Sequence, residues 1–178
     1  CAAVFPALDP NNPTTTGILS KPQIALMDTT LNAPQADQAT IGFTKKLGHS
    51  NLFVDLEAVY VEGDEEITVR DRNFSLVYNP TSGRYAVVRP NTSYDQVNVY
   101  GNEGHSEYKA FVASLNGTLS GGHYVTASFT YADKMNISDD FSPEFPYGYP
   151  SDPTNMESEW GPARGAEELR FVASGVFL

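Results

Sequence analysis

Five segments of the chain alternate apolar and polar side chains with a period of two residues. They span residues 38–46, 51–61, 108–116, 123–132 and 168–178. The side chains of a β-strand point alternately to its two faces, so each segment places apolar residues on one face and polar residues on the other. Each segment is also close to the length of about 9 to 11 residues that a tilted strand needs to cross a lipid bilayer. The pattern predicts an all-β chain of amphipathic strands.

The connections between these segments alternate in length. Residues 47–50 and 119–122 are short and contain glycine, as hairpin turns do. Residues 62–107 and 133–167 are long and rich in Pro, Gly, Asn, Asp and Tyr. Connections beyond about 15 residues are uncommon in soluble domains, whereas transmembrane barrels have short turns on one side and longer loops on the other. We therefore expect an antiparallel transmembrane β-barrel segment, a fragment of a larger barrel, with the turns and the loops on opposite sides.

The composition excludes several other classes of protein. No window holds about 18 consecutive apolar residues, which excludes a transmembrane helix. The formal net charge of −11 repels a phosphate backbone and argues against a nucleic-acid partner. The single cysteine, Cys1, permits neither an intrachain disulfide nor a cysteine-based zinc site.

Two other folds also fit the alternation of side chains. In a secreted or surface β-sandwich that binds carbohydrate, the same apolar faces would pack on each other instead of facing lipid. In a mature lipoprotein, Cys1 and the polar residues after it would form an acylated tether for a surface domain. The sequence upstream of Cys1 distinguishes these possibilities, since a lipobox would precede it in a lipoprotein.

Several stretches of the chain resemble the barrel of TonB-dependent outer-membrane receptors of the Oar-like kind. Residues 36–48 (ADQATIGFTKKLG) resemble a strand-turn-strand motif of that family, and residues 106–110 (SEYKA) look like the start of a later strand. The loop and strand that follow in the family are similar to residues 150–153, 159–164 and 170–177. The resemblance runs from about Pro34 to Leu178.

This resemblance implies a place in the bacterial outer membrane and a role in the TonB-energised uptake of an unidentified extracellular substrate. It implies contact with outer-membrane lipid, and with the TonB complex through a plug domain. The plug domain, the TonB box and the terminal aromatic residue of the family have no counterpart in residues 1–178, so we expect one segment of a larger barrel. The residues expected to face its lumen are Asp55, Glu57, Thr126, Ser128, Thr130 and Arg170.

Two polar patterns contain the residue types that bind metal ions. Glu103, His105 and Glu107 alternate, so a strand would project all three from one face, where they could hold a divalent ion. Residues 62–66 carry four acidic side chains that could attract calcium, but they lack the spacing of an EF-hand loop. A solvated strand and a charged loop account for both patterns, so we expect no metal site.

The long connection at residues 133–167 holds the best candidates for contact with a ligand. Aromatic rings stack on sugars or on apolar rings, although such a loop can equally pack on itself. The candidate ligand-binding residues are Phe141, Phe145, Tyr147, Tyr149 and Trp160. The sequence has no nucleophile elbow, P-loop, zinc-protease or dinucleotide-binding motif. We therefore expect no enzymatic activity, no catalytic residue and no cofactor.

Overall fold

The structure, a computed structural model, describes residues 21–48, 51–137 and 150–178. This part of the chain is mostly β-strand, which confirms the all-β, antiparallel character expected from the sequence. Its elements are β1 (Ile24–Met27), β2 (Gln35–Leu47), β3 (Asn51–Asp71), β4 (Ser75–Asn79), β5 (Arg84–Val88), β6 (Val97–Thr118), β7 (Tyr124–Asn136), the 3-10 helix η3 (Met156–Glu159), β8 (Gly161–Pro162) and β9 (Leu169–Val176). Within the described ranges, no helix is long and apolar enough to cross a membrane.

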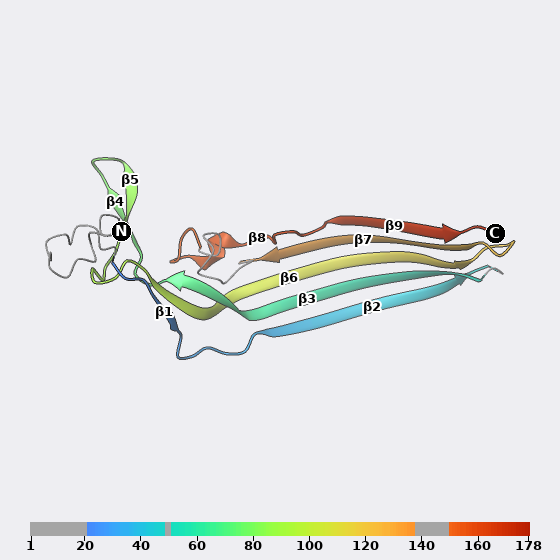
Figure 1. Cartoon of the computed structure of the whole chain (residues 1–178), viewed down its shortest axis with the longest axis horizontal. Coiled ribbons are helices and arrows are strands. Elements are labelled where there is room, and N and C mark those ends of the chain that lie inside the picture. The colour runs from blue at the N-terminus through green and yellow to red at the C-terminus, as the bar shows by residue number, and fades with distance from the viewer. Residues whose placement is uncertain (1–20, 49–50, 138–149) are drawn as a thin grey trace, which may run out of the picture.

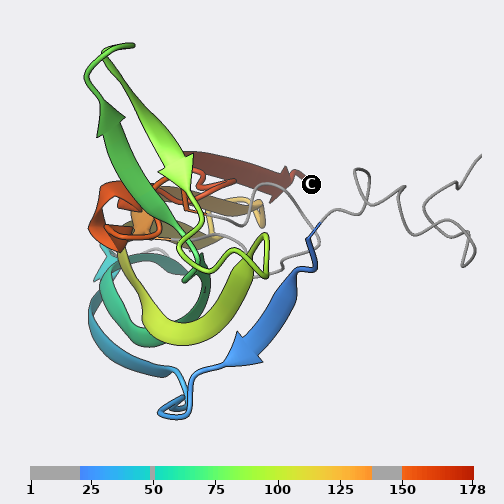
Figure 2. The same ribbon diagram turned by 90° about the vertical axis from the view of Figure 1, so that its left-hand side faces the viewer.

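Four long strands form the centre of one antiparallel sheet (Figure 1). They lie in the order β2-β3-β6-β7, and both β8 and β9 pair with β7. The short strand β1 pairs in parallel with the start of β6. Seen along the strands, the sheet curves like a section of a barrel wall (Figure 2). The described residues do not close this wall into a barrel, because β2 and β9 do not pair with each other.

The connections divide between the two ends of the sheet. β2 ends and β3 begins at the right-hand end in Figure 1, where the short turn between β6 and β7 also lies. β3 ends and β6 begins toward the opposite end, which we call the loop end, and β7 ends and β9 begins on that side. Neighbouring strands of an antiparallel sheet run in opposite directions, so this separation follows from strand order. The predicted separation of short turns from long connections is confirmed.

The strands run further toward the loop end than the sequence pattern indicated. β3 holds 21 residues and β6 holds 22, and β4 and β5 form a further hairpin between them. The expectation that all of residues 62–107 form a loop is therefore wrong. The apolar alternation stops near Val61, but backbone hydrogen bonds do not depend on side-chain polarity, so the ladder continues past that point.

The register places the apolar residues of five strands on one face of the sheet, which we call the apolar face. One row across the sheet joins Ile41, Ala58, Phe111, Tyr131 and Leu169, and the next joins Phe43, Leu56, Ala113, Phe129 and Phe171. Cross-strand partners project to the same side. The large side chains of these rows are exposed, from 37% for Leu56 to 75% for Ile41. Among the described residues no second sheet covers this face, as it would in a β-sandwich.

The opposite face of the sheet is polar and is organised around Asp55. The Thr44 hydroxyl donates a hydrogen bond to Asp55 Oδ1 at 2.7 Å, and Asn116 Nδ2 donates to Asp55 Oδ2 at 2.9 Å. All of the residues predicted to face a lumen share this face by register: Asp55, Glu57, Thr126, Ser128, Thr130 and Arg170. The sheet is therefore amphipathic as a whole, with the polarity that a lipid-facing outside and a wet inside require.

The two faces of β7 should respond oppositely to a charge. We expect Ala127→Arg, on the apolar face, to lower the free energy of unfolding by about 2–4 kcal/mol, because the guanidinium enters the lipid near the bilayer midplane. Ser128→Arg introduces the same side chain one residue away on the polar face and should change stability little. Urea unfolding of each protein in lipid vesicles measures both values. Equal losses in the two variants would contradict the assignment of faces.

Candidate ligand-binding site

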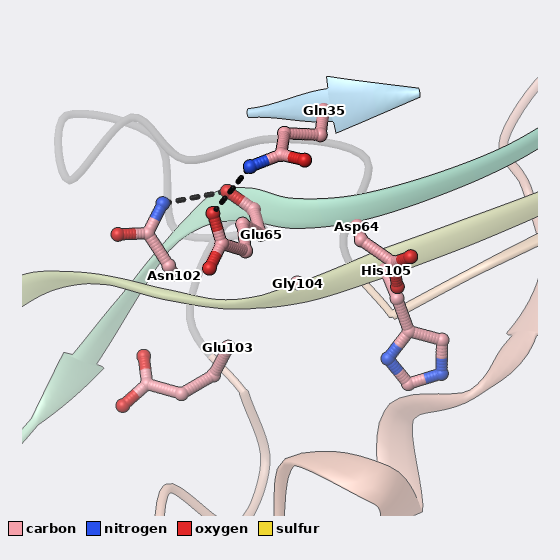
Figure 3. Close-up of a pocket in the computed structure, with 7 residues that line it drawn as sticks. All are labelled: Gln35, Asp64, Glu65, Asn102, Glu103, Gly104 and His105. Atoms are coloured by element: carbon pink, nitrogen blue, oxygen red, sulfur yellow. Dashed lines mark hydrogen bonds between the residues drawn. The ribbon is translucent and has the colours of Figure 1, made fainter. Parts of the chain in front are cut away.

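A cavity of about 500 Å³ opens among three strands toward the loop end of the sheet (Figure 3). β2 contributes its first residue, β3 two residues and β6 four. The lining residues are Gln35, Asp64, Glu65, Asn102, Glu103, Gly104 and His105. A volume of this size is in the range of about 300–1,000 Å³ that small-molecule sites occupy. Five of these seven residues carry an amide or a carboxylate, so the cavity suits a polar ligand.

Two irregularities in the β3–β6 ladder form this cavity. From the pair Gly63–Ser106 to the pair Glu66–Gly104, β3 takes three residue steps and β6 takes two. From Glu66–Gly104 to the pair Thr68–Gly101, β3 takes two residue steps and β6 takes three. Each strand therefore has one extra residue, as in a β-bulge. The extra residues fall at Asp64–Glu65 and Asn102–Glu103, which are four of the seven residues of the lining. The backbone of Glu65 adopts a positive φ of 54°.

Gly104 allows the two strands to approach closely at the bulges. A Cβ atom at this position would lie 2.7 Å from the backbone oxygen of Glu66 and 2.9 Å from the Thr68 Cγ2 atom. Real Cβ atoms do not make contacts this short with backbone, so any other residue would push the strands apart. The glycine therefore fixes the width of the ladder beside the cavity.

Three amide side chains hold Glu65 in place, and Figure 3 shows two of them beside it. Gln35 Nε2 donates to Glu65 Oε2 at 3.4 Å, and Asn32 Nδ2 donates to Glu65 Oε1 at 3.2 Å. Asn102 Nδ2 donates to the Glu65 backbone oxygen at 2.6 Å. Asn102 in turn accepts a hydrogen bond from the Asn32 backbone N–H at 2.7 Å. The carboxylate is thus oriented by neutral donors, and no cation pairs with it within this group.

The segment that follows β1 brings Asn32 to the cavity. β1 pairs with residues 97–100 of β6, and Asp28 at its end lies 3.9 Å from the Arg72 guanidinium. The backbone N–H and the hydroxyl of Thr30 donate to the Asp28 carboxylate, and these bonds hold its pKa below the usual value. The Asp28 carboxylate therefore stays charged and keeps its hydrogen bonds to Thr30. The turn that these bonds form directs the chain back toward Glu65.

Glu103 differs from the other two carboxylates of the lining because arginine pairs with it. Arg70 lies 2.6 Å and Arg72 3.5 Å from Glu103 Oε1, and Thr68 donates to Oε2 at 3.3 Å. Across the described ranges, no lysine or arginine pairs with Asp64 or Glu65. The uncompensated negative charge of the cavity therefore comes from Asp64 and Glu65.

His105 lines the cavity and also contacts residues of the segment between β7 and β9. Its ring stacks on Trp160 with 4.6 Å between ring centroids and an interplanar angle of 25°. Its Nε2 atom lies 3.8 Å from a Glu157 carboxylate oxygen, and its backbone oxygen accepts a hydrogen bond from Ile137 at 3.2 Å. The stack places η3 and the residue after it against β6.

The alternating triad of Glu103, His105 and Glu107 does not assemble into one site. Glu103 pairs with arginine, His105 stacks on Trp160, and Glu107 accepts hydrogen bonds from Lys109 at 2.5 Å and from Tyr60 at 3.2 Å. No group of three metal-ligating side chains occurs in the part of the chain that the structure describes. The acidic residues 62–66 likewise engage separate partners or face solvent.

Of the five aromatic residues predicted to bind a ligand, the structure describes Trp160. Trp160 is half-buried and contacts His105, so it lies beside the cavity without lining it. The remaining four, Phe141, Phe145, Tyr147 and Tyr149, lie outside the described residues. Sequence reasoning missed Gln35 and Asn102, because single polar residues in a strand carry no signal of their own. The available signal was Gly104, a strand glycine beside an acidic group, which is typical of a bulge.

A buried polar network supports the loop end behind the cavity, and the sequence did not reveal it. Asn73, only 2% exposed, donates through Nδ2 to the backbone oxygens of Asn91 and Tyr94 at 2.9 and 3.0 Å and accepts from the Asn91 N–H at 2.7 Å. Asp71 pairs with Arg89 and accepts from the Val97 N–H at 3.0 Å. This network ties residues 89–97 to the end of β3.

We expect Asn73→Ala to loosen this connection. The substitution leaves several buried backbone groups without partners, which should cost about 2 kcal/mol locally and raise the open fraction roughly thirtyfold. Limited proteolysis of the purified protein in detergent micelles should then cut faster within residues 72–97. Asn79→Ala is the control, since Asn79 only caps the exposed β4–β5 turn. Equal cleavage rates in the two variants would show that Asn73 does not hold the loop.

Comparisons with known proteins agree with this architecture. The model of the outer membrane beta barrel domain family matches residues 1–178, the whole chain. The searches of curated proteins and of solved structures returned no match. The family match indicates a location in the bacterial outer membrane, and the exposed apolar face and the polar face of the sheet fit that location. The chain belongs to the outer membrane beta barrel domain family.

Proposed function

We propose that the chain forms part of the barrel of a TonB-dependent outer-membrane receptor, which takes up an extracellular substrate with energy supplied through TonB. The barrel acts by binding and passage, without catalysis and without a resident cofactor. Its partners are outer-membrane lipid around the apolar face, the substrate at the loop end, and the TonB complex through a plug domain. The loop end faces outside the cell, and the short turns face the periplasm.

The length of β3 and β6 is the observation that carries this proposal. A strand crosses a bilayer in about 9–11 residues, whereas these strands have 21 and 22 residues. Each therefore continues for about 10 residues past the membrane, or about 30 Å at the rise of a β-strand. An extension of this length does not serve the crossing itself. It carries the cavity and its supporting network away from the membrane, where a receptor meets its ligand.

The polar face supports a role in passage. Asp55, Glu57 and Arg170 lie among hydroxyl-bearing residues of β7 on that face, and such a surface stays wet inside a wide barrel. A plug or a moving substrate could exchange hydrogen bonds with it. The resemblance of residues 36–48 to the strand-turn-strand of TonB-dependent receptors points to the same class.

Cross-linking to TonB tests the proposal directly. Intact cells that express the native protein with an affinity tag are treated with formaldehyde, and the tagged protein is purified and probed for TonB. We expect an adduct, because an energised receptor must contact TonB from the periplasm. A general porin purified from the same cells is the negative control. If an established TonB-dependent receptor yields an adduct in these cells and this protein does not, the proposal is wrong.

Single cysteines test the orientation of the barrel. In a background in which Cys1 is replaced by serine, Thr81→Cys and Ser151→Cys should react with a membrane-impermeant thiol reagent on intact cells. Ser120→Cys lies in the exposed β6–β7 turn and should stay protected until the outer membrane is opened. The readout is the labelled fraction on a denaturing gel. Preferential labelling of Ser120→Cys on intact cells would mean that the loop end faces the periplasm.

A further inference from the structure

We propose that the cavity between the bulged parts of β3 and β6 binds a small polar molecule through a protonated amine or guanidinium group. The inference goes beyond the uptake proposal, because it concerns the recognition chemistry of this cavity and holds whether or not TonB energises the barrel. It rests on the shape of the bulged ladder, on the charge balance of the lining and on the hydrogen-bonding groups that surround it.

The shape of the cavity is set by the backbone. Because β3 and β6 each carry one extra residue, the ladder opens locally and then regains its register at Thr68 and Gly101. Gly104 keeps the two strands close on either side of the opening. The cavity of about 500 Å³ lies at this opening of the ladder, and a volume of that size accommodates a small molecule.

The charge balance selects a cation. Arg70 and Arg72 offset the charge of Glu103, but Glu65 is held only by neutral amides. Asp64 is exposed and makes no hydrogen bond or ion pair with another described residue. Two carboxylates therefore remain available to a ligand, within a chain whose formal net charge is −11. A field of this sign attracts cationic ligands and repels anionic ones.

The neighbouring groups favour an organic cation over a metal ion. No three metal-ligating side chains come together in the described residues, whereas calcium requires about six to eight oxygen ligands. A guanidinium or ammonium group instead needs a few acceptors around a hydrogen-bonding fork or point charge. Asp64 and Glu65 provide these acceptors at two points of the lining; the amides of Gln35 and Asn102 lie beside Glu65, and Asp64 lies on the side of His105 (Figure 3).

Comparing the binding of two probes of the same size, one charged and one neutral, tests the proposal. Isothermal titration of the purified protein in detergent micelles uses N-acetyl-arginine amide and N-acetyl-citrulline amide, which differ in charge at the same size. We expect the arginine probe to bind about fivefold more tightly, which is the upper end of the contribution of one solvated ion pair. Equal binding of the two probes, or no binding of the arginine probe, would overturn the proposal.

Variants locate the binding in this cavity. Asp64→Asn removes a charge without breaking a contact, and Glu65→Gln keeps the shape of the side chain. The double variant should weaken binding of the arginine probe about tenfold. Glu168→Gln makes the same change as Glu65→Gln at an exposed residue outside the cavity and should leave the affinity unchanged. Full affinity in the double variant would overturn the proposal, as would complete displacement of the probe by calcium chloride. Because no step needs TonB, these results are independent of the cross-linking test.

Discussion

The hydrogen-bonded ladder between β3 and β6 is the constraint on which the rest of the structure depends. It is the longest pairing in the sheet and runs from Asn51 and Thr118 to Asp71 and Asn98. The interior of a bilayer offers no water to backbone N–H and C=O groups, so strands that cross it must satisfy one another. Once this register is set, side-chain parity decides which face every residue of the neighbouring strands occupies. The apolar rows and the Asp55 network both follow from it.

The two bulges in this ladder show how a site can be placed in a sheet without disturbing its faces. One extra residue in β3 alone would have reversed the parity of every later residue relative to β6. The compensating residue in β6 restores the pairing, so Val69 and Tyr100 are partners again beyond the cavity. The disturbance is thus confined to the lining. The positive φ of Glu65 is a local strain of the kind that gathers at functional sites.

The loop end is stabilised differently from the part of the sheet that contacts lipid. The apolar rows are exposed and rely on the membrane, whereas Asn73, Asp71 and Arg89 form a buried network of hydrogen bonds and ion pairs. Outside the membrane water competes for polar groups, so a network of this kind holds only where the protein shields it. The small apolar core contributes there as well, through Val69 and Met156. Together these contacts join the end of β3 to the start of β6 beyond the cavity.

The sequence by itself determined the five amphipathic strands, the separation of turns from long connections, and the residues of the polar face such as Asp55 and Thr126. These features are local, because side-chain alternation and glycine-containing turns each depend on residues that are neighbours in the sequence. Only the tertiary structure decided that β3 extends to Asp71 and β6 begins at Val97, and that Gln35, Glu65 and Asn102 meet at one cavity. Their meeting depends on bulges, and a bulge is defined by a partner strand about forty residues away. The stacking of Trp160 on His105 could not be predicted from the sequence either. No local pattern specifies which distant strand a loop residue contacts.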